Sequence, residues 1–239
     1  MGCEQMTYTN STFEKIAYGP FVSTVDFESD LNLIKYACFG QISKTLLNDR
    51  MIMSCGIRTD FNDYSGQMSN PFDQVSPRFS ASYSLSAKWF LNFNLGRYFQ
   101  LPPYTVLGYR DQNGILANKE NEVTYIQADH LVGGLEFNPN QYAKITIESF
   151  YKAYDNYPFL IKDSISLANL GGDFGIIGNE EVTSSSEGRS YGVELFLQQK
   201  LSKKFYGILA YTWVKSEFSD KDGQSRPSAW DNRNIISAT

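Results

Sequence analysis

The sequence has little of several residue types on which common protein classes depend. It contains one histidine, His130, and three cysteines, Cys3, Cys38 and Cys55. A zinc site built from several histidines is thereby excluded, and an odd, sparse set of cysteines implies no disulfide framework. We therefore expect free thiols, no metal site and no cofactor.

Long apolar runs and an excess of positive charge are also missing. No stretch approaches the roughly 18 consecutive apolar residues that a membrane helix needs. The net charge of -5 over 239 residues argues against a nucleic-acid binder, which usually carries a basic patch. The first residues, 1–6, contain neither the basic nor the apolar part of an export signal. A helical membrane protein is excluded.

What the sequence does contain is a repeated alternation of apolar and polar residues. Phe79, Ala81, Tyr83 and Leu85 alternate with four serines, which is the period of a β-strand. The same alternation recurs along the chain. It predicts strands at 33–46, 51–62, 78–86, 89–99, 130–137, 143–154, 190–201 and 205–216, a further one beginning near Arg233, and a possible one at 15–27.

The connections between these strands alternate in length. Short turns follow residues 46, 85, 137 and 201, whereas long connections span 63–77, 100–129, 155–189 and 217–232. Short turns at one end and long loops at the other are typical of an up-and-down outer-membrane barrel. The sequence therefore predicts an all-β fold, an antiparallel transmembrane β-barrel segment of about nine or ten strands.

A test of register supports this pairing. Directly opposed residues of an antiparallel pair point to the same face, so their polarities should match. Counting outward from each short turn pairs residues of matching polarity in four hairpins. The predicted pairs include Ile42 with Cys55, Ala81 with Phe93, Leu135 with Ile145, Glu136 with Lys144, Leu197 with Leu209, and Leu201 with Phe205.

The alternation alone does not say whether the apolar face meets lipid or a second sheet. Strands of about 10 to 13 residues, aromatic residues at strand ends and the asymmetry of the connections favour lipid. Cys38 and Cys55 then lie on the lipid face. Two alternatives remain open. One is a soluble β-sandwich binding module, and the other is an intact small barrel that acts as an adhesin or as a rim hydrolase using His130.

Four runs of residues carry a family resemblance: Ser76–Leu85, Gly96–Tyr104, Gly188–Leu195 and Trp230–Arg233. Over residues 35–239 the chain resembles the barrel of a TonB-dependent outer-membrane receptor of the kind common in Bacteroidetes. The resemblance implies a 22-stranded barrel in the outer membrane around an N-terminal plug. It further implies import of a scarce nutrient, such as a siderophore, cobalamin or an oligosaccharide. Implied partners are outer-membrane lipid, the plug domain, the TonB complex and the substrate, but no nucleic acid.

The departures from this family pattern also give an expectation. The sequence shows no plug and no TonB-contacting box, and it ends inside the predicted last strand. We therefore expect residues 1–239 to form a partial barrel domain, in which 1–32 is a poorly assigned leading segment. Alone, this partial domain should transport nothing.

Candidate binding residues are polar and aromatic groups at the expected extracellular rim. Tyr and Trp offer rigid apolar area together with hydrogen bonds, which suits a sugar or a siderophore. No catalytic group is expected, because no nucleophile stands beside His130. Asp220 to Gly223 resembles part of a calcium loop, but Phe218 stands where that motif needs aspartate, so a tight turn is expected. The candidates are Arg97, Tyr98, Gln100, Tyr104, Tyr109, Arg110, Tyr154, Tyr157, Trp230, Asp231 and Arg233.

Overall fold

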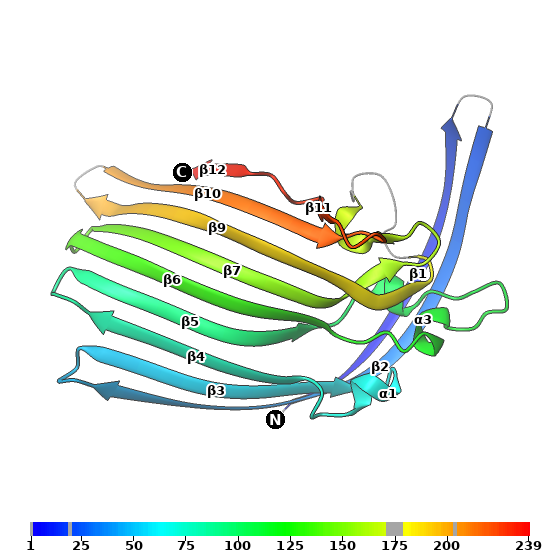
Figure 1. The fold of residues 1–239 in the computed structure, drawn as a ribbon, viewed down its shortest axis with the longest axis horizontal. Helices are drawn as coiled ribbons and strands as arrows, with labels where there is room; N and C mark the ends of the chain where they lie inside the picture. The colour runs from blue at the N-terminus through cyan, green and yellow to red at the C-terminus, as the bar shows by residue number, and fades with distance from the viewer. Residues whose placement is uncertain (1, 19–20, 171–178, 203–204) are drawn as a thin grey trace.

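One curved antiparallel sheet contains every strand that the structure describes (Figure 1). The computed structural model describes residues 2–18, 21–170, 179–202 and 205–239. The long strands follow one another in chain order, which confirms the predicted all-β, up-and-down architecture. They are β1 (Gly2–Tyr18), β2 (Phe21–Leu46), β3 (Met51–Asn62), β4 (Val75–Ser84), β5 (Trp89–Gln100), β6 (Ile126–Asn140), β7 (Ala143–Leu160), β9 (Val182–Ser202) and β10 (Phe205–Ser219).

Short elements lie in or beside the long connections. Their bounds are β8 (Ile165–Ser166), β11 (Ser225–Pro227), β12 (Asn234–Ala238), α1 (Gly66–Ser69), α2 (Tyr104–Leu107), α3 (Ala117–Glu120) and a 3-10 turn at Leu167–Asn169. β11 and β12 both pair with β10, and β1 pairs with β2. The described strands therefore form an open sheet rather than a closed barrel. No helix among the described residues is long and apolar enough to cross a membrane.

The leading segment differs from its prediction. Residues 15–27 do not form one strand, because 15–18 end β1 and 21–27 begin β2, and Tyr18 pairs with Phe21. β2 starts twelve residues before the predicted 33. The other boundary differences lie mainly at the ends toward the long connections, where β6, β7, β9 and β10 extend past the predicted limits.

Register is confirmed in two hairpins and needs correction in the others. Ile42 faces Cys55, and Ala81 faces Phe93, as predicted. Leu135 faces Ile147 instead of Ile145, and Glu136 faces Thr146 instead of Lys144. β6 runs closer to the turn than predicted, to Asn140, whereas β7 begins at Ala143 as predicted, and the pairing shifts between Phe137 and Asn140. Pro139 lies at this irregularity, where a residue without an N–H is tolerated.

The hairpin between β9 and β10 needs a smaller correction. Leu197 faces Leu209 as predicted, whereas Phe205 pairs with Ser202 rather than with Leu201. The register shifts between Phe205 and Gly207, close to the turn. The error is therefore confined to the end of the hairpin, and the face of the strands was predicted correctly.

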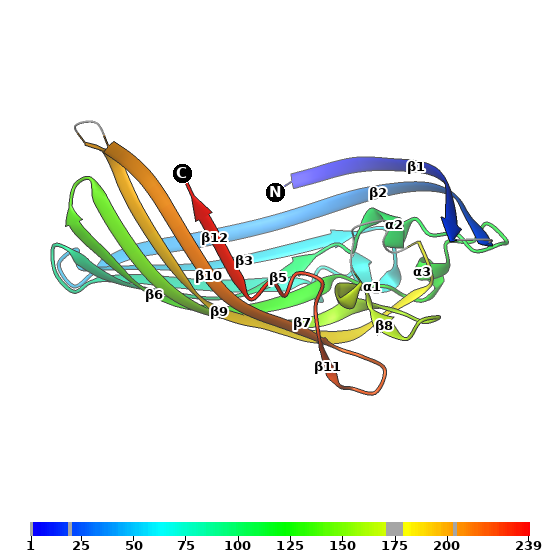
Figure 2. The ribbon, with the colours of Figure 1, turned by 90° about the horizontal axis from the view of Figure 1, so that it is seen from above.

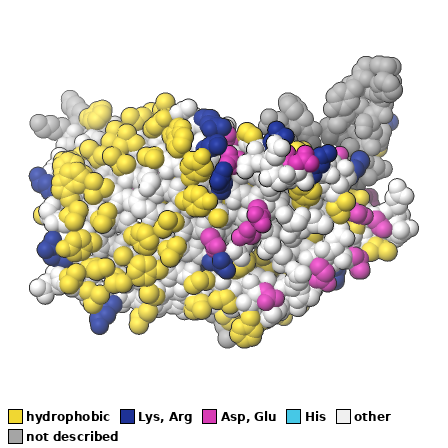
Figure 3. Space-filling view, viewed as in Figure 1, with side chains coloured by type: hydrophobic (Ala, Val, Ile, Leu, Met, Phe, Trp, Pro, Cys, Tyr) yellow, Lys and Arg dark blue, Asp and Glu magenta, His cyan; other side chains and the backbone are white. Residues whose placement is uncertain are grey.

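The apolar face of the sheet is uncovered. Leu91, Leu95 and Ile147 are each about half exposed, at 49%, 50% and 51%. Figure 3 shows a broad apolar band over the strands, with charged side chains gathered at its border toward the long connections. A β-sandwich would bury this face against a second sheet. Because all described strands belong to one sheet, the sandwich hypothesis is wrong.

The charged border of the band is a cross-strand row. Arg97 of β5 faces Asp129 of β6, and Arg189 of β9 faces Glu217 of β10. In each pair the guanidinium donates to the carboxylate, with nitrogen to oxygen distances of 2.7 Å. At the border, the next residue on the same face of the strand is charged and paired instead of apolar. This is expected at the edge of a lipid-facing band.

The opposite, concave face of the sheet is polar. The register places Asn92 and Asn94 of β5 on this face, together with Glu148 of β7 and Glu194 of β9. Glu136 and Gln198 have the same parity on their strands and lie on this face as well. In a barrel, alternate residues face the lumen, so this is the lumenal wall.

The buried core lies between the long connections rather than under the sheet. Tyr64, Met68, Leu107, Val123 and Leu160 are almost fully buried there, together with Leu31 and Leu33 of β2. Figure 2 shows α1 and α2 between the β1–β2 pair on one side and β7 on the other. The loop end of the sheet thus carries a packed structure that positions the residues described next.

Candidate ligand-binding site

An aromatic cleft lies at the loop end of the concave face. Its volume is about 570 Å³. Five of the predicted binding residues line it, and so does the single histidine. The five predicted residues are Tyr98, Gln100, Tyr154, Tyr157 and Trp230, and the histidine is His130. We refer to this site as the aromatic cleft.

Strand alternation explains how these residues meet. Tyr98 faces Ala128 across β5 and β6, and Ala128 faces Tyr154 across β6 and β7. Directly opposed residues share a face, so the three positions form one row on the concave wall. Tyr157 follows a shift in the register of β7, and Trp230 comes from the segment between β11 and β12.

Phe218 of β10 forms the buried base beside the cleft. Its ring centroid lies 5.3 Å from that of Tyr154, 4.9 Å from that of Tyr157 and 5.7 Å from that of Trp230. The ring is fully buried. Gly188 of β9 provides the room, because a Cβ there would lie 2.3 Å from the ring. The aromatic side chains of the cleft are therefore fixed by packing on one another.

Tyr98 is held between two neighbouring strands. Its ring centroid lies 4.6 Å from that of His130, and the Arg78 guanidinium lies 4.5 Å from the tyrosine ring. Arg78 and His130 both face Gly96, one from each side. Tyr98 packs over that glycine, 3.0 Å from where a Cβ would stand. His130 thus serves as a packing partner of Tyr98.

Three other predicted residues lie in the long connection between β5 and β6. Tyr104 packs against Tyr8, with ring centroids 5.5 Å apart, and Arg110 donates hydrogen bonds to the carbonyls of Gly114 and Asp30. Tyr109 is half-buried, and burial raises the pKa of its phenol. Tyr104 and Arg110 thus hold the loop to β1 and β2, and none of the three residues lines the cleft.

The remaining predicted residues pair with one another or face outward. Arg97 lies on the face opposite Tyr98, in the charged border with Asp129. The sequence pattern could have predicted this position, because Arg97 lies two residues after Leu95 and therefore shares its face. Asp231 accepts a hydrogen bond from the Ser216 amide and pairs with Arg233 at 2.9 Å, which fixes the chain after Trp230.

Sequence reasoning missed Phe218 and Arg78. Phe218 lies beyond the predicted end of its strand, and Arg78 belongs to a run noted only for its family resemblance. The parity of the pairing carries a signal for Arg78: it faces Gly96 and thus lies on the concave face with Asn94 and Tyr98. For Phe218, the only feature of the sequence that could have indicated a buried position is its apolar side chain beside a polar turn.

The other motifs have structural roles. Asp220 accepts hydrogen bonds from the amides of Asp222 and Gln224, and Gly223 adopts a left-handed backbone with φ of 69°. Hydrogen bonding by Arg226 lowers the pKa of the Asp220 carboxyl. The predicted tight turn is thus confirmed. The cysteines are free thiols, and the described residues contain no group of three or more His, Cys, Asp or Glu that could hold a metal.

Solved structures with the same fold include outer-membrane receptors. The ferric-catecholate import receptor Fiu of E. coli K12 has a TM-score of 0.66 at 13% identity, over 99% of this chain and 37% of its own. The pyoverdine receptor FpvA of Pseudomonas aeruginosa PAO1 has a TM-score of 0.60 at 13% identity, over 89% of this chain and 28% of its own. The alcaligin receptor FauA of Bordetella pertussis has a TM-score of 0.58 at 13% identity, over 99% of this chain and 38% of its own. The chain thus spans less than two fifths of the length of these three receptors.

Sequence comparison gives the family directly. No curated protein matches the chain. The profile described as "TonB dependent receptor-like, beta-barrel" matches residues 2–235, almost the whole chain. Together with the lipid-facing band and the polar concave wall, this match establishes that the chain belongs to the β-barrel family of TonB-dependent receptors, which are transport receptors rather than enzymes.

Proposed function

We propose that this chain forms part of the wall of an outer-membrane receptor that takes up a scarce nutrient. The aromatic cleft is the place where this wall touches the nutrient. The observation that carries the proposal is the convergence of Tyr98, Tyr154, Tyr157 and Trp230 on one cleft of about 570 Å³ at the loop end of the concave face. Rigid aromatic walls with a few polar groups are what small-molecule sites use.

The location of the cleft fits this role. It lies on the lumenal side, inside the charged border of the lipid-facing band, so a ligand would reach it from the end with the long connections. The chain does no chemistry of its own in this proposal. Passage of the nutrient would require a plug domain and energy from the TonB complex, both of which come to this proposal from the family.

The substrate class proposed is a siderophore, cobalamin or an oligosaccharide. Support for a siderophore comes from the solved structures, whose names include receptors for pyoverdine and alcaligin. Support for a sugar comes from the cleft, because flat aromatic faces stack on sugar rings as well as on aromatic ligands.

Growth of a deletion strain tests the proposal. The strain lacking the receptor is complemented with the intact receptor and supplied with ferric siderophores, cobalamin or oligosaccharides as the limiting nutrient. The Trp230→Ala variant should reduce uptake of the dependent nutrient at least about tenfold, since Trp230 lines the cleft. Trp213→Ala is the matched control, because Trp213 faces Val193 on the lipid side.

Two results would contradict the proposal. The first is that no nutrient in the panel depends on the receptor. The second is that the Trp230 and Trp213 variants take up the dependent nutrient equally well at equal amounts of protein in the outer membrane.

A further inference from the structure

Arg78 carries a positive charge that the described residues leave without an oxygen acceptor. Every other arginine of the chain donates to a carboxylate or to backbone carbonyls: Arg50, Arg58, Arg97, Arg110, Arg189, Arg226 and Arg233. Arg78 instead lies over the ring of Tyr98. Its neighbour Arg58, on the adjacent strand, is bound at 2.6 Å by both carboxylate oxygens of Asp60. One of the two adjacent arginines is therefore neutralised, and the other is not.

The stack over Tyr98 fixes Arg78 without using its hydrogen-bond donors. A guanidinium that lies on an aromatic face keeps its N–H groups in the plane of the guanidinium, pointing away from the ring. Tyr98 is itself fixed, because it packs over Gly96 and against His130. The donors of Arg78 are thus held in place and unpaired, which is the arrangement that an anionic ligand needs.

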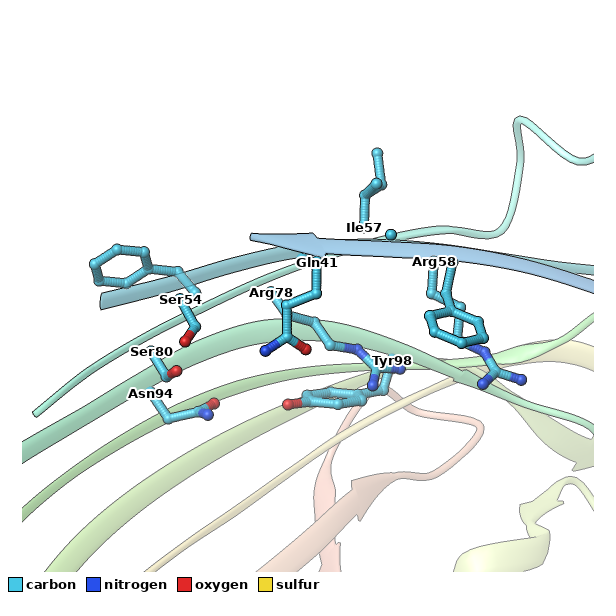
Figure 4. A pocket seen from close by; sticks show the side chains of 12 residues that line it. Gln41, Ser54, Ile57, Arg58, Arg78, Ser80, Asn94 and Tyr98 are labelled. Atoms are coloured by element: carbon cyan, nitrogen blue, oxygen red, sulfur yellow. The ribbon is translucent and has the colours of Figure 1, made fainter. Parts of the chain in front are cut away.

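These donors belong to a polar pocket beside the aromatic cleft. The pocket has a volume of about 300 Å³, and Tyr98 lines both it and the cleft. Figure 4 shows Gln41, Ser54, Arg78, Asn94 and Tyr98 on the same side of the strands, with Ile57 on the other. Amide and hydroxyl groups therefore surround the guanidinium, and they can complete the hydrogen bonds of a bound oxygen group.

The surrounding charge is also positive. The cross-strand row that holds Arg78 and Gly96 continues through His130 to Lys152 on the same face. Two acids line the neighbouring pocket together with Arg78, and both are already paired: Asp60 is bound by Arg58, and Glu4 is bound by Lys35. A negative group that neutralises Arg78 must therefore come from outside the described chain.

We propose that the Arg78 pocket binds an anionic oxygen group, in the simplest case a carboxylate, of a ligand whose flat apolar part lies in the aromatic cleft. This inference rests on the proposed function and narrows it to nutrients with a negative charge. The forked donors of arginine match the two oxygens of a carboxylate. The same carboxylate could be supplied by an acidic side chain of another part of the receptor, and the experiment separates these sources.

Saturation-transfer NMR on the intact receptor in detergent micelles tests the proposal with two small probes. Benzoate combines a flat ring with a carboxylate, and benzamide is its neutral counterpart of similar shape. Benzoate should bind at least about tenfold more tightly than benzamide. Arg78→Gln should remove this preference, whereas Arg78→Lys should keep part of it, because lysine retains the charge without the fork. Arg189→Gln, on the lipid-facing border, should leave it unchanged.

Equal binding of the two probes, or no detectable binding of benzoate, would overturn the proposal. An acidic group of the receptor itself would be indicated if benzoate fails to bind and Arg78→Gln lowers the melting temperature of the intact receptor. The proposed function fails separately, since it requires that Trp230→Ala reduces nutrient uptake. If Trp230→Ala reduces uptake but the probes bind equally, only the anionic class of the nutrient is wrong.

Discussion

At the scale of single residues, Gly188 decides the shape of the aromatic cleft. A Cβ at this position would lie 2.3, 2.4 and 2.6 Å from three atoms of the Phe218 ring. That ring is fully buried against Tyr154, Tyr157 and Trp230, so it has little space into which to move. Any side chain at residue 188 must therefore displace the aromatic residues that form the cleft.

We predict that Gly188→Ala lowers the affinity for the nutrient about tenfold or more while the protein still inserts in the outer membrane. The reason is displacement of Phe218 and of the rings packed on it, since overpacking forces side chains off their preferred rotamers. The measurement is nutrient binding to cells that carry equal amounts of receptor. Gly133→Ala is the control, because a Cβ there meets nothing within 4 Å. Unchanged binding in Gly188→Ala would show that the cleft does not contact the nutrient.

At the residue scale, the sequence indicated which aromatic residues gather at the loop end of the sheet, whereas their role in binding stays a prediction. Tyr98, Tyr154, Tyr157 and Trp230 were chosen as binding candidates, and the structure brings them together in one cleft. Arg97 was chosen beside Tyr98, but neighbouring residues on a strand point to opposite faces. Phe218 could not be singled out, because its importance lies in three contacts with residues distant in sequence.

At the scale of elements, the segment 101–125 ties two distant parts of the sheet together. It leaves β5 and returns as β6, yet Ser29 of β2 donates a hydrogen bond to its Gly108 carbonyl. At its other side, Asn118 donates to the carbonyls of Val106 and Glu180 and accepts from the Val182 amide. Asn118 is fully buried, so the bonds at the β9 side form away from water.

Asn118→Ala should destabilise this segment by roughly 2 to 4 kcal/mol, since each buried group left without a partner costs about 1 to 3 kcal/mol. Hydrogen exchange in the intact receptor should show faster exchange across 101–125 and at Val182, but not in β4. Asn113→Ala is the control, because Asn113 is exposed and bonds only to Asp111 through its amide nitrogen. If both variants exchange alike, Asn118 does not hold the segment.

The loop core should also respond to alkaline pH. Burial raises the pKa of Tyr125 to about 12, and it raises that of Tyr64 as well. Because both phenols must stay protonated in the folded core, its stability is constant below pH 10 and falls as pH rises from 10 to 12. For Tyr125 the loss reaches about 2 to 3 kcal/mol.

Limited proteolysis between pH 9 and 11 measures this effect on the intact receptor. Cutting within 101–125 should accelerate above pH 10, once corrected for the activity of the protease on an unfolded substrate. In a Tyr64→Phe, Tyr125→Phe variant the acceleration should largely disappear, because phenylalanine does not ionise. An equal acceleration in both proteins would mean that other groups open the core.

Element boundaries could be predicted only where the chain lies at the depth of the apolar band. There the alternation is regular, and β3 and β5 were predicted to within one residue at each end. Toward the long connections the strands are solvated or packed against loops, so the alternation that marks a strand is lost. The packing of α1, α2 and α3 into a core could not be predicted, because it depends on contacts between separate connections.

At the scale of the whole molecule, the two faces of the sheet have opposite surroundings. The convex face is apolar and uncovered, and the concave face carries amides, carboxylates and the aromatic cleft. An uncovered apolar face that extends over many strands is unfavourable in water and favourable in lipid. Insertion in a bilayer is therefore what makes this arrangement of side chains stable.

This argument predicts opposite outcomes for two adjacent residues of β5. Leu91 faces Leu135 and Tyr83 within the apolar band, whereas Asn92 lies on the concave face and accepts a hydrogen bond from Ser82. Leu91→Arg should destabilise the intact receptor by about 2 to 4 kcal/mol in urea unfolding from lipid vesicles, the cost of a charge at the bilayer midplane. Asn92→Ser should change stability by less than about 1 kcal/mol, because water can replace the lost contact. A neutral effect of Leu91→Arg would mean that the convex face does not meet lipid, because a cationic side chain would then remain hydrated.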